Sequence, residues 1–327
     1  MLDRIRKPWP DRRAERTLGA VSLLVVLLIL AMVAGILVGA WPLVSHEGLS
    51  WLGGGGSVDT QLSNMLTSGV HPAASAFHLR AWPLIYGTLL TTGMAVVLAL
   101  PVALLASIFI VEFAPPRLRA VAVPLIRLLA SVPSVIYGLI GILVLVPFVG
   151  NDLITLHEKV SVQNVVELTG AGLGVAVVVL AVMITPIMVA LITDALASVP
   201  PAWREGAIAL GLHPLRATLA VSMRAIRPAI VAATVLATAR ALGEAVMLYM
   251  VDGSVGFTPK PVDGAIFFFE PLKTLAAAIV ENNEGLNAPA LKASVYAFAA
   301  LLMFSAFALS VSGYLVKLPL RRYQVSR

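Results

Sequence analysis

Residues 229–250 read AIVAATVLATARALGEAVMLYM, an apolar run long enough to cross a lipid bilayer that also carries Arg240 and Glu244. An ionised side chain near the centre of a membrane helix costs about 2.5–3.5 kcal/mol on insertion scales, so such residues are expected to serve a function. At positions i and i+4 the two side chains would share one helix face, where they either neutralise each other or both face a polar cavity. A structural ion pair that locks helices together is the competing interpretation.

The composition of the 327-residue chain is that of an integral membrane protein. Hydrophobic residues make up 59% of the chain, charged residues make up 12%, and the mean hydropathy is +0.94. Soluble domains are roughly half apolar and a quarter charged. The chain has no cysteine, which excludes disulfides and thiolate chemistry. The sequence therefore predicts an all-α integral membrane domain.

Six apolar stretches predict six membrane spans. The spans are expected at 18–41, 84–111, 121–149, 171–197, 229–250 and 290–316. The first exceeds the roughly 7–15 residues of a signal-peptide core, and we interpret it as an uncleaved span, although Val38-Gly39-Ala40 resembles a signal-peptidase site. Residues 42–82, which contain four consecutive glycines, are expected to form a flexible, exposed connection with one short helix. A short surface helix is expected over 271–280.

The distribution of lysine and arginine predicts the orientation. Sixteen of these 23 residues lie in residues 1–17, after the second span, in residues 198–228 and in residues 317–327. Four lie in the loops 42–82, 150–170 and 251–289, a fifth, Lys292, lies at the extracytoplasmic start of the sixth span, and the other two are Arg127 and Arg240. Because cytoplasmic loops are enriched in these residues, we expect cytoplasmic tails at 1–17 and 317–327, a cytoplasmic loop at 198–228, and three extracytoplasmic loops. The net charge of +6 reflects this topology, so we expect no nucleic-acid partner.

The sequence contains no arrangement of side chains suited to catalysis. The five histidines lie in loops and none belongs to a His-Glu-x-x-His array, so no metal site is expected. There is no phosphate-binding loop, so no nucleotide cofactor is expected in this chain. Ser131 and Ser134 lack a His, Lys or Asp partner in the apolar spans. Together with Pro133 and Tyr137, they are expected to pack helices or line a pathway.

The segment 198–228 is expected to fold as two short helices joined by a corner. Residues 202–210 form the first helix, with Pro201 at its first position; Gly211 ends it, and Pro214 begins the second. The run Glu205-Gly-Ala207-Ile-Ala-Leu-Gly211 resembles the cytoplasmic coupling loop of bacterial ABC importer permeases. The resemblance implies that Trp203, Glu205, Gly206, Ala207 and Gly211 contact an ATPase subunit.

The sequence departs from the family pattern in one place, so it does not define the second short helix in detail. Where the family usually has Ile-x-Leu-Pro, this chain has Val221-Ser-Met223-Arg224. An ordinary interfacial helix is the competing interpretation of the whole segment.

Three further stretches narrow the resemblance to one group of ABC importer permeases. They are Tyr86-Gly-Thr-Leu-Leu-Thr-Thr92, Ala130-Ser-Val-Pro-Ser-Val-Ile-Tyr-Gly138 and Arg240-Ala-Leu-Gly-Glu244. Over roughly residues 83–316 the chain resembles the permeases of phosphate-specific Pst-type importers, and the C-type more than the A-type subunit. This implies the type I ABC importer permease fold in a bacterial inner membrane. It also implies three partners: a second, A-type (PstA-like) permease, an ATPase dimer that binds ATP and Mg2+, and an extracytoplasmic phosphate-binding protein.

The implied function is phosphate import powered by the partner ATPase, so the chain itself is not expected to be an enzyme. Arg240 and Glu244 match the charged pair associated with phosphate passage, and an arginine offers charge-assisted donors to a dehydrated anion. We further expect residues 202–224 to act on this pair through one continuous helix. Two alternatives stay open: a permease for another oxyanion such as molybdate or sulfate, and a stand-alone channel or secondary transporter.

Overall fold

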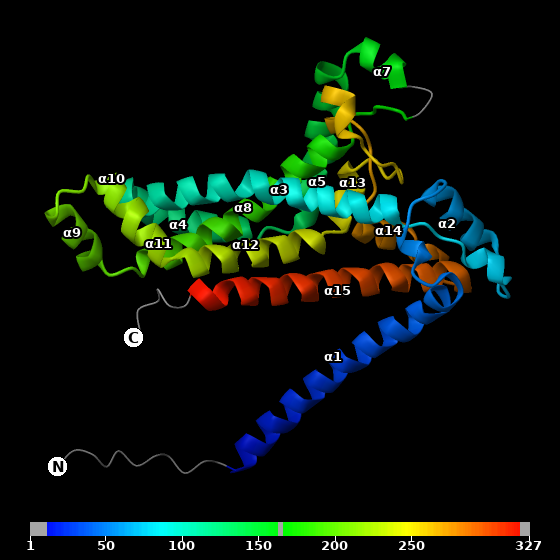
Figure 1. The fold of residues 1–327 in the computed structure, drawn as a ribbon, viewed down its shortest axis with the longest axis horizontal. Helices are drawn as coiled ribbons and strands as arrows, with labels where there is room; N and C mark the ends of the chain where they lie inside the picture. The colour runs from blue at the N-terminus through cyan, green and yellow to red at the C-terminus, as the bar shows by residue number, and fades with distance from the viewer. Residues whose placement is uncertain (1–11, 163–165, 321–327) are drawn as a thin grey trace.

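The computed structural model describes residues 12–162 and 166–320, and within them every regular element is a helix or a helical turn (Figure 1). The elements are α1 (Arg12–Glu47), η1 (Ser50–Leu52), α2 (Val58–Thr67), η2 (Ala74–Phe77), α3 (Trp82–Ile108), η3 (Phe109–Phe113), α4 (Pro116–Ala130), α5 (Ser134–Ile140), η4 (Gly141–Leu145), α6 (Val146–Phe148), η5 (Val149–Leu153), α7 (Leu156–Val162), α8 (Leu173–Ala197), α9 (Pro201–Ala209), α10 (Pro214–Ala217), η6 (Thr218–Ser222), α11 (Met223–Ala225), α12 (Arg227–Leu242), α13 (Val246–Val251), η7 (Pro261–Phe268), α14 (Leu275–Glu281), η8 (Asn283–Gly285) and α15 (Pro289–Leu320). The turns η3 to η6 are π-helical and the other η turns are 3-10.

The helices are long and apolar enough to cross a membrane several times. Five in the described part of the chain pass this test, or up to six when Pro214–Ala225 and Arg227–Leu242, which meet at a 67° bend, are taken as one span. This agrees with the expected all-α, six-span fold. Figure 1 shows α9 and α10 at one end of the long axis and α2 at the other, and we call these the α9 end and the α2 end.

The core is built around α8, which packs between α3 and α12. Every fourth residue along one face of α3 is small and buried, namely Thr91, Ala95, Ala99, Ala103 and Ser107. The hydroxyl of Ser107 donates to the carbonyl oxygen of Val189 in α8 at 3.3 Å. On α12, Ala233 and Ala237 are buried in the same way. Small residues let helices in lipid approach closely, so these faces fix α3 and α12 against α8.

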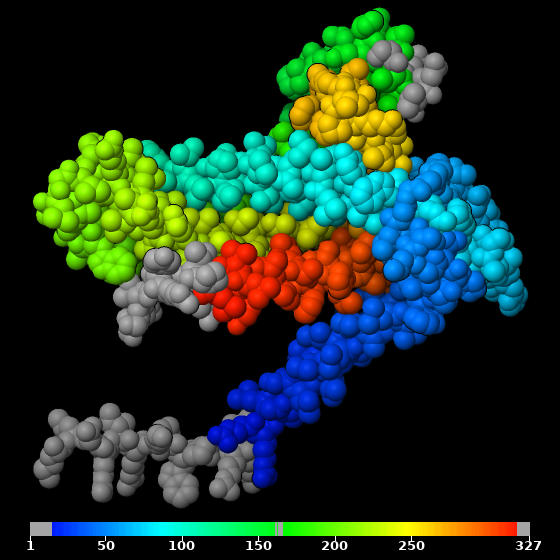
Figure 2. All heavy atoms as spheres, in the orientation of Figure 1, coloured from blue at the N-terminus to red at the C-terminus, as the bar shows by residue number. Residues whose placement is uncertain are grey.

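Helix α1 packs with the remaining helices only near its C-terminal end. Ala40 and Leu43 are buried there, and a Cβ on Gly39 would lie 2.6 Å from the ring of Tyr296 in α15. No residue of the most apolar window of α1 is buried, and Figure 2 shows its first half separated from α15. The single chain therefore leaves this apolar helix for lipid or for another subunit to cover.

The α2 end differs from the expected flexible connection over 42–82. Trp51, Val58, Met65 and Leu79 are buried in one cluster with residues of α14 and α15. The glycine run suggested mobility, but these apolar side chains on both sides of it form a core. The expected surface helix over 271–280 is also corrected, because α14 begins at Leu275 and its first turn is buried.

The expected third span, 121–149, is divided in the structure. Helix α4 ends at Ala130, and α5 begins at Ser134 after Pro133. Proline lacks an N–H donor and disfavours helix at the residue before it, which explains the break. The stretch long and apolar enough to cross a membrane is therefore Ser134–Leu153, and α4 is a separate helix that contains no buried residue.

The expected fifth span, 229–250, is also broken. Helix α12 ends at Leu242, residues 243–245 are not helical, and α13 covers Val246–Val251. Glycine is a poor helix former because it loses the most backbone entropy, so Gly243 is a natural stopping point.

Candidate functional site

Two helix breaks lie next to each other, residues 131–133 between α4 and α5 and residues 243–245 between α12 and α13. Arg240, in the last turn of α12, donates from Nη1 to the carbonyl oxygen of Ala130 at 3.3 Å, and α5 packs against α13. Discontinuous helices whose backbone groups are free often form the binding sites of membrane transporters. We call this arrangement the paired breaks.

Two glycines of the third span allow the paired breaks to come together. A Cβ on Gly138 would lie 2.9 Å from Met250 Sδ and 3.1 Å from the Cα of Met247. A Cβ on Gly141 would lie 2.6 Å from Val251 Cγ1. Glycine at these positions therefore lets the start of the third span contact α13 directly.

The last three carbonyl oxygens of α4 each accept a hydrogen bond from a side chain. The bonds are Ser131 Oγ to Leu128 at 2.7 Å, Tyr137 OH to Leu129 at 3.1 Å and Arg240 Nη1 to Ala130 at 3.3 Å. Carbonyls at a helix C-terminus have no partner within the helix and carry partial negative charge. These donors stabilise the end of α4 and hold Arg240 beside the break. Ser131 and Pro133 are exposed, and Ser134 and Tyr137 are half-buried.

Arg240 and Glu244 do not form the expected pair on one helix face. The helix stops between them at Leu242, and within the described part of the chain no ion pair joins the two side chains. Both residues are half-buried. One guanidinium N–H contacts Ala130, and the remaining N–H groups can bind an anion by charge-assisted hydrogen bonds.

The expected continuous helix from residues 202–224 to Arg240 is also absent. The helical segment Pro214–Ala225 meets α12 at the 67° bend, and Ile226 at that bend has φ −92° and ψ 5°. The backbone route from α9 to the paired breaks therefore passes through a corner.

Helix α9 stands at the α9 end as an exposed element. Pro201 occupies its first turn, as expected, and none of its residues is buried. Trp203 and Ile208 are each 39% exposed and Leu210 is 84% exposed. Large apolar side chains exposed together on one short helix are typical of a surface that a partner protein covers.

The glycines of this segment have different roles. Gly211 has φ +89°, a conformation that favours glycine, and Leu212 N–H closes the turn by donating to the carbonyl oxygen of Ala207 at 3.2 Å. A Cβ on Gly206 would meet no atom within 4 Å. Gly206 and Glu205 are exposed, so nothing within this chain requires either residue type. The second short helix, left open by the sequence, is α10 followed by the π-helical turn η6 and α11.

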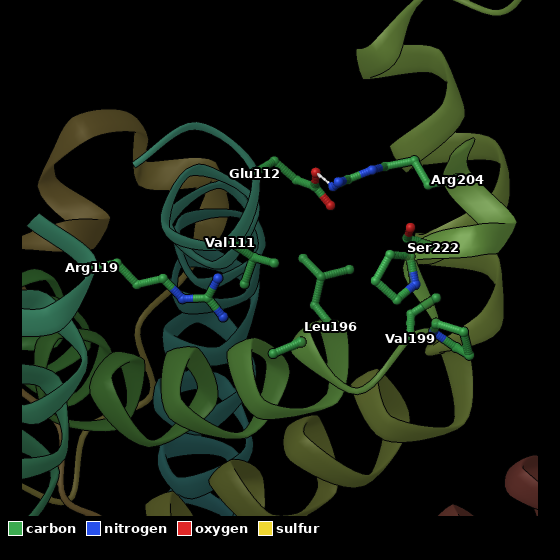
Figure 3. A pocket seen from close by; sticks show the side chains of 10 residues that line it. Val111, Glu112, Arg119, Leu196, Val199, Arg204 and Ser222 are labelled. Carbon is green, nitrogen blue, oxygen red and sulfur yellow. Dashed lines mark hydrogen bonds and ion pairs between the residues drawn. The ribbon is translucent and has the colours of Figure 1, made fainter. Parts of the chain in front are cut away.

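A cavity of about 150 Å³ lies between α9 and the ends of α3 and α8 (Figure 3). It is lined by Val111, Glu112, Arg119, Leu196, Ala197, Val199, Pro200, Pro201, Arg204 and Ser222. Glu112 of η3 and Arg204 of α9 form an ion pair at its edge. Glu112 was not predicted as a site residue. An acid directly after a long apolar stretch was the available signal, but it did not indicate a partner.

A charged cluster at the α2 end was also missed. Lys273 is 3% exposed, and its Nζ lies 2.6 Å from Asp59 Oδ1 and 2.7 Å from Glu281 Oε2. Burial by itself lowers the pKa of Lys273, but the bonds to Asp59 and Glu281 raise it overall. Asp252 lies within electrostatic range of Lys273. Asp59 is far in sequence from the other three residues, so no local pattern indicates that the cluster forms.

Asp252 is the most deeply buried acid of this cluster. It is 0% exposed; its Oδ1 accepts from Ser254 N–H at 2.9 Å, whereas Oδ2 has no hydrogen-bond partner. Burial raises the pKa of Asp252 to about 7, against the smaller lowering effects of the Ser254 and Thr274 backbone groups. The carboxyl group therefore changes its charge near neutral pH.

Comparisons with known proteins agree with this architecture. The family model described as "Binding-protein-dependent transport system inner membrane component" matches residues 99–319. The chain is 35% identical over 233 residues to the Mycobacterium tuberculosis "Phosphate transport system permease protein PstC 1", covering 68% of this chain and 67% of the relative. It is 29% identical over 319 residues to PstC of Haemophilus influenzae, covering 93% of each.

A solved structure shows the same fold at lower identity. An inward-facing structure of the MetNI methionine ABC transporter matches with a TM-score of 0.50 and 19% identity, covering 73% of this chain and 94% of the matched chain. Together with the family match, this likeness shows that the chain has the type I ABC importer permease fold. This chain belongs to the family of binding-protein-dependent transport system inner membrane components.

Proposed function

We propose that this chain is the C-type permease subunit of an ATP-driven importer that moves inorganic phosphate into the bacterial cytoplasm. The observation that carries the proposal is its similarity to PstC proteins along almost its full length. The paired breaks add a chemical reason, because they hold the guanidinium of Arg240 in a half-buried position. An arginine in such a position suits a dehydrated tetrahedral anion.

The same proposal assigns the partners. A second, A-type permease completes the pathway beside the half-buried Arg240 and Glu244, and an extracytoplasmic phosphate-binding protein delivers the substrate. A dimer of ATPase subunits binds α9 and the turn after it through Trp203, Glu205, Gly206, Ala207 and Gly211. The exposed apolar side chains of α9 support this assignment. ATP and Mg2+ act in those subunits, and this chain is a transport subunit of the inner membrane.

The proposal places the α9 end in the cytoplasm. The excess of Lys and Arg in residues 1–17, 198–228 and 317–327 supports this orientation. In Figure 1 the last described turns of α15 point toward the α9 end, which fits tails on that side. Under this orientation, Asp252 and Lys273 lie on the extracytoplasmic side.

At the paired breaks, Arg240 is proposed to contact phosphate in transit. Glu244 is half-buried two residues beyond the helix end and carries the opposite charge. We assign it the role of weakening anion binding at Arg240, so that the site releases its substrate. Ser131, Pro133, Ser134 and Tyr137 shape the wall of the pathway beside Arg240.

The test uses the complete complex in proteoliposomes with the binding protein present. We expect ATP-dependent accumulation of radiolabelled phosphate that unlabelled phosphate competes away and that sulfate and molybdate leave unchanged. Equal competition by sulfate or molybdate would assign a different oxyanion. Uptake that persists without the ATPase subunits would indicate a channel and contradict the proposal.

The role of Arg240 is tested in the same assay with Arg240→Lys. Loss of the planar guanidinium removes charge-assisted bonds of about 1.5–3 kcal/mol, which corresponds to a fall in uptake of roughly 10- to 100-fold. Glu244→Gln is expected to slow release and lower the maximal rate. Arg227→Lys is the matched control, because Arg227 is exposed at the start of the same helix. Wild-type uptake in both Arg240→Lys and Glu244→Gln would remove these residues from the pathway.

A further inference from the structure

The ion pair between Glu112 and Arg204 joins two elements that no other side-chain bond connects. Glu112 lies in the π-helical turn η3, which extends α3 beyond Ile108, and its side chain is 9% exposed. Arg204 lies in the middle of α9, and its side chain is 34% exposed. Figure 3 shows the two side chains pointing toward each other across the edge of the cavity.

Apart from this ion pair, α9 is attached mainly through contacts with the neighbouring η6 and α10. None of its residues is buried. Among the described residues, Arg204 to Glu112 is the only side-chain hydrogen bond or ion pair from α9 to another element. The backbone joins α9 to α8 through residues 198–200 and to α10 through the turn at Gly211.

The space beneath α9 is not filled by packed side chains. The cavity of about 150 Å³ separates Arg204 from Leu196 in α8, and Arg119 of α4 reaches into it from the opposite side (Figure 3). A helix over a cavity lacks the close contacts that transmit displacement through a packed core. The charge pair, in contrast, is partly desolvated, so its geometry is held more strongly than that of an exposed pair.

We propose that Glu112 and Arg204 are positioning residues that pass the movement of α9 directly to α3. Helix α3 packs against α8 through its small-residue face, so a displacement at Glu112 reaches the core without passing the 67° bend. This gives a second route from the coupling surface to the transmembrane core, in addition to the backbone route through α10 to α12. The inference rests on the proposed contact between α9 and an ATPase.

The experiment measures phosphate transported per ATP hydrolysed in the complete reconstituted complex. We expect Glu112→Gln and Arg204→Gln complexes to retain their ATPase subunits at the wild-type ratio. In both variants, we expect the amount of phosphate transported per ATP hydrolysed to fall by at least about fivefold. This factor corresponds to the lower end of typical coupling free energies. The double variant should be no worse than either single variant, because each removes the same interaction. The charge exchange Glu112→Arg with Arg204→Glu should restore at least half of the wild-type ratio.

The matched control is Asp194→Asn. It breaks the Arg127–Asp194 ion pair between α4 and α8, whose side chains are 59% and 56% exposed and which does not involve α9. Its ratio of phosphate to ATP should equal that of the wild type.

Three results would overturn the inference: wild-type coupling in both single variants, no recovery on charge exchange, or additive losses in the double variant. Loss of the ATPase subunits from the single variants would also contradict it, since the pair would then serve docking. Failure of the proposed function would appear differently, because the wild-type complex itself would show no uptake driven by ATP.

Discussion

The two ends of the molecule differ in how far their charged and apolar side chains are buried. At the α2 end, Lys273 is buried between two acids, and Trp51 and Met65 belong to a core. At the α9 end, Trp203 and Leu210 stay exposed, and no residue of α9 is buried. A protein buries apolar surface wherever its own chain can provide a partner. The difference shows that the α2 end is packed within the chain, whereas the α9 end leaves apolar side chains exposed, as expected if the proposed ATPase covers them.

Lys273→Met is the strongest test of the α2 end. Removing the ammonium leaves Asp59 and Glu281 close together with Asp252 beside them, and breaking a buried pair typically costs about 3–5 kcal/mol. We expect a clear fall in the apparent Tm of the detergent-purified subunit. Lys292→Met is the matched control, because Lys292 is exposed on α15. An unchanged Tm would mean that the α2 end does not depend on this cluster.

Asp252→Asn tests the same end through its pH dependence. The folded pKa of about 7 exceeds the ordinary aspartate value of 3.8, so the wild type loses stability as pH rises from about 4 to about 7. Asparagine cannot ionise, so the difference in apparent Tm between the variant and the wild type should grow as pH rises from about 4 to about 7. Above about pH 7 this difference should stay constant. The pH-dependent part of this difference in stability can reach about 4 kcal/mol, since one pKa unit corresponds to about 1.4 kcal/mol.

The control for this pH series is Asp152→Asn, because Asp152 is exposed in η5. It should show no such widening. A lead that is the same at all pH values would contradict a folded-state pKa near neutrality.

Trp203→Ala tests the opposite behaviour of the α9 end. Truncating an exposed aromatic that becomes buried at an interface typically costs at least about 2 kcal/mol of binding, roughly a 30-fold weaker ATPase contact. The Tm of the isolated subunit should stay unchanged, because Trp203 is 39% exposed. Co-purification of the ATPase and thermal unfolding measure the two quantities. A lower Tm with normal ATPase retention would mean that Trp203 stabilises this chain and does not bind the ATPase, which would contradict the difference between the two ends.

Gly211→Ala is expected to have the smallest effect. A Cβ at φ +89° costs about 1–2 kcal/mol locally and loosens the turn that Leu212 N–H closes. Hydrogen exchange at the amide of Leu212 should speed up by roughly tenfold, since about 1.4 kcal/mol corresponds to one decade. Gly206→Ala is the matched control, because its Cβ meets no atom within 4 Å. Equal exchange in both variants would remove the argument for glycine at residue 211.

The sequence predicted the elements more reliably than their interruptions. Composition and apolar run length identified α8 within two residues of the expected 171–197, and Pro201, Gly211 and Pro214 gave the corner at the α9 end. The breaks at residues 131–133 and 243–245 were not predicted, although Pro133 and Gly243 are visible in the sequence. Hydropathy averages over such breaks, and a single proline or glycine is often tolerated in a membrane helix.

The candidate site was predicted as residues but not as geometry. Arg240 was identified from the cost of a charge in an apolar run, but its partner, the carbonyl oxygen of Ala130, lies 110 residues away in sequence. The same holds for Glu112 with Arg204 and for Lys273 with Asp59. These contacts depend on how the helices pack, and no local periodicity encodes that packing.

The π-helical turns have a consequence for chain length. The turn η6 is closed by Met223 N–H bonding to the carbonyl oxygen of Thr218, a wider ring than that of an α-helix. Such a turn holds one residue more than an α-helical turn at the same place. Deleting one residue from Thr218–Ser222 is therefore expected to produce an ordinary α-helix. The same residues of α12 would still pack against α8. Homologues one residue shorter here would keep the same packing, and the gap in an alignment with them belongs inside this turn.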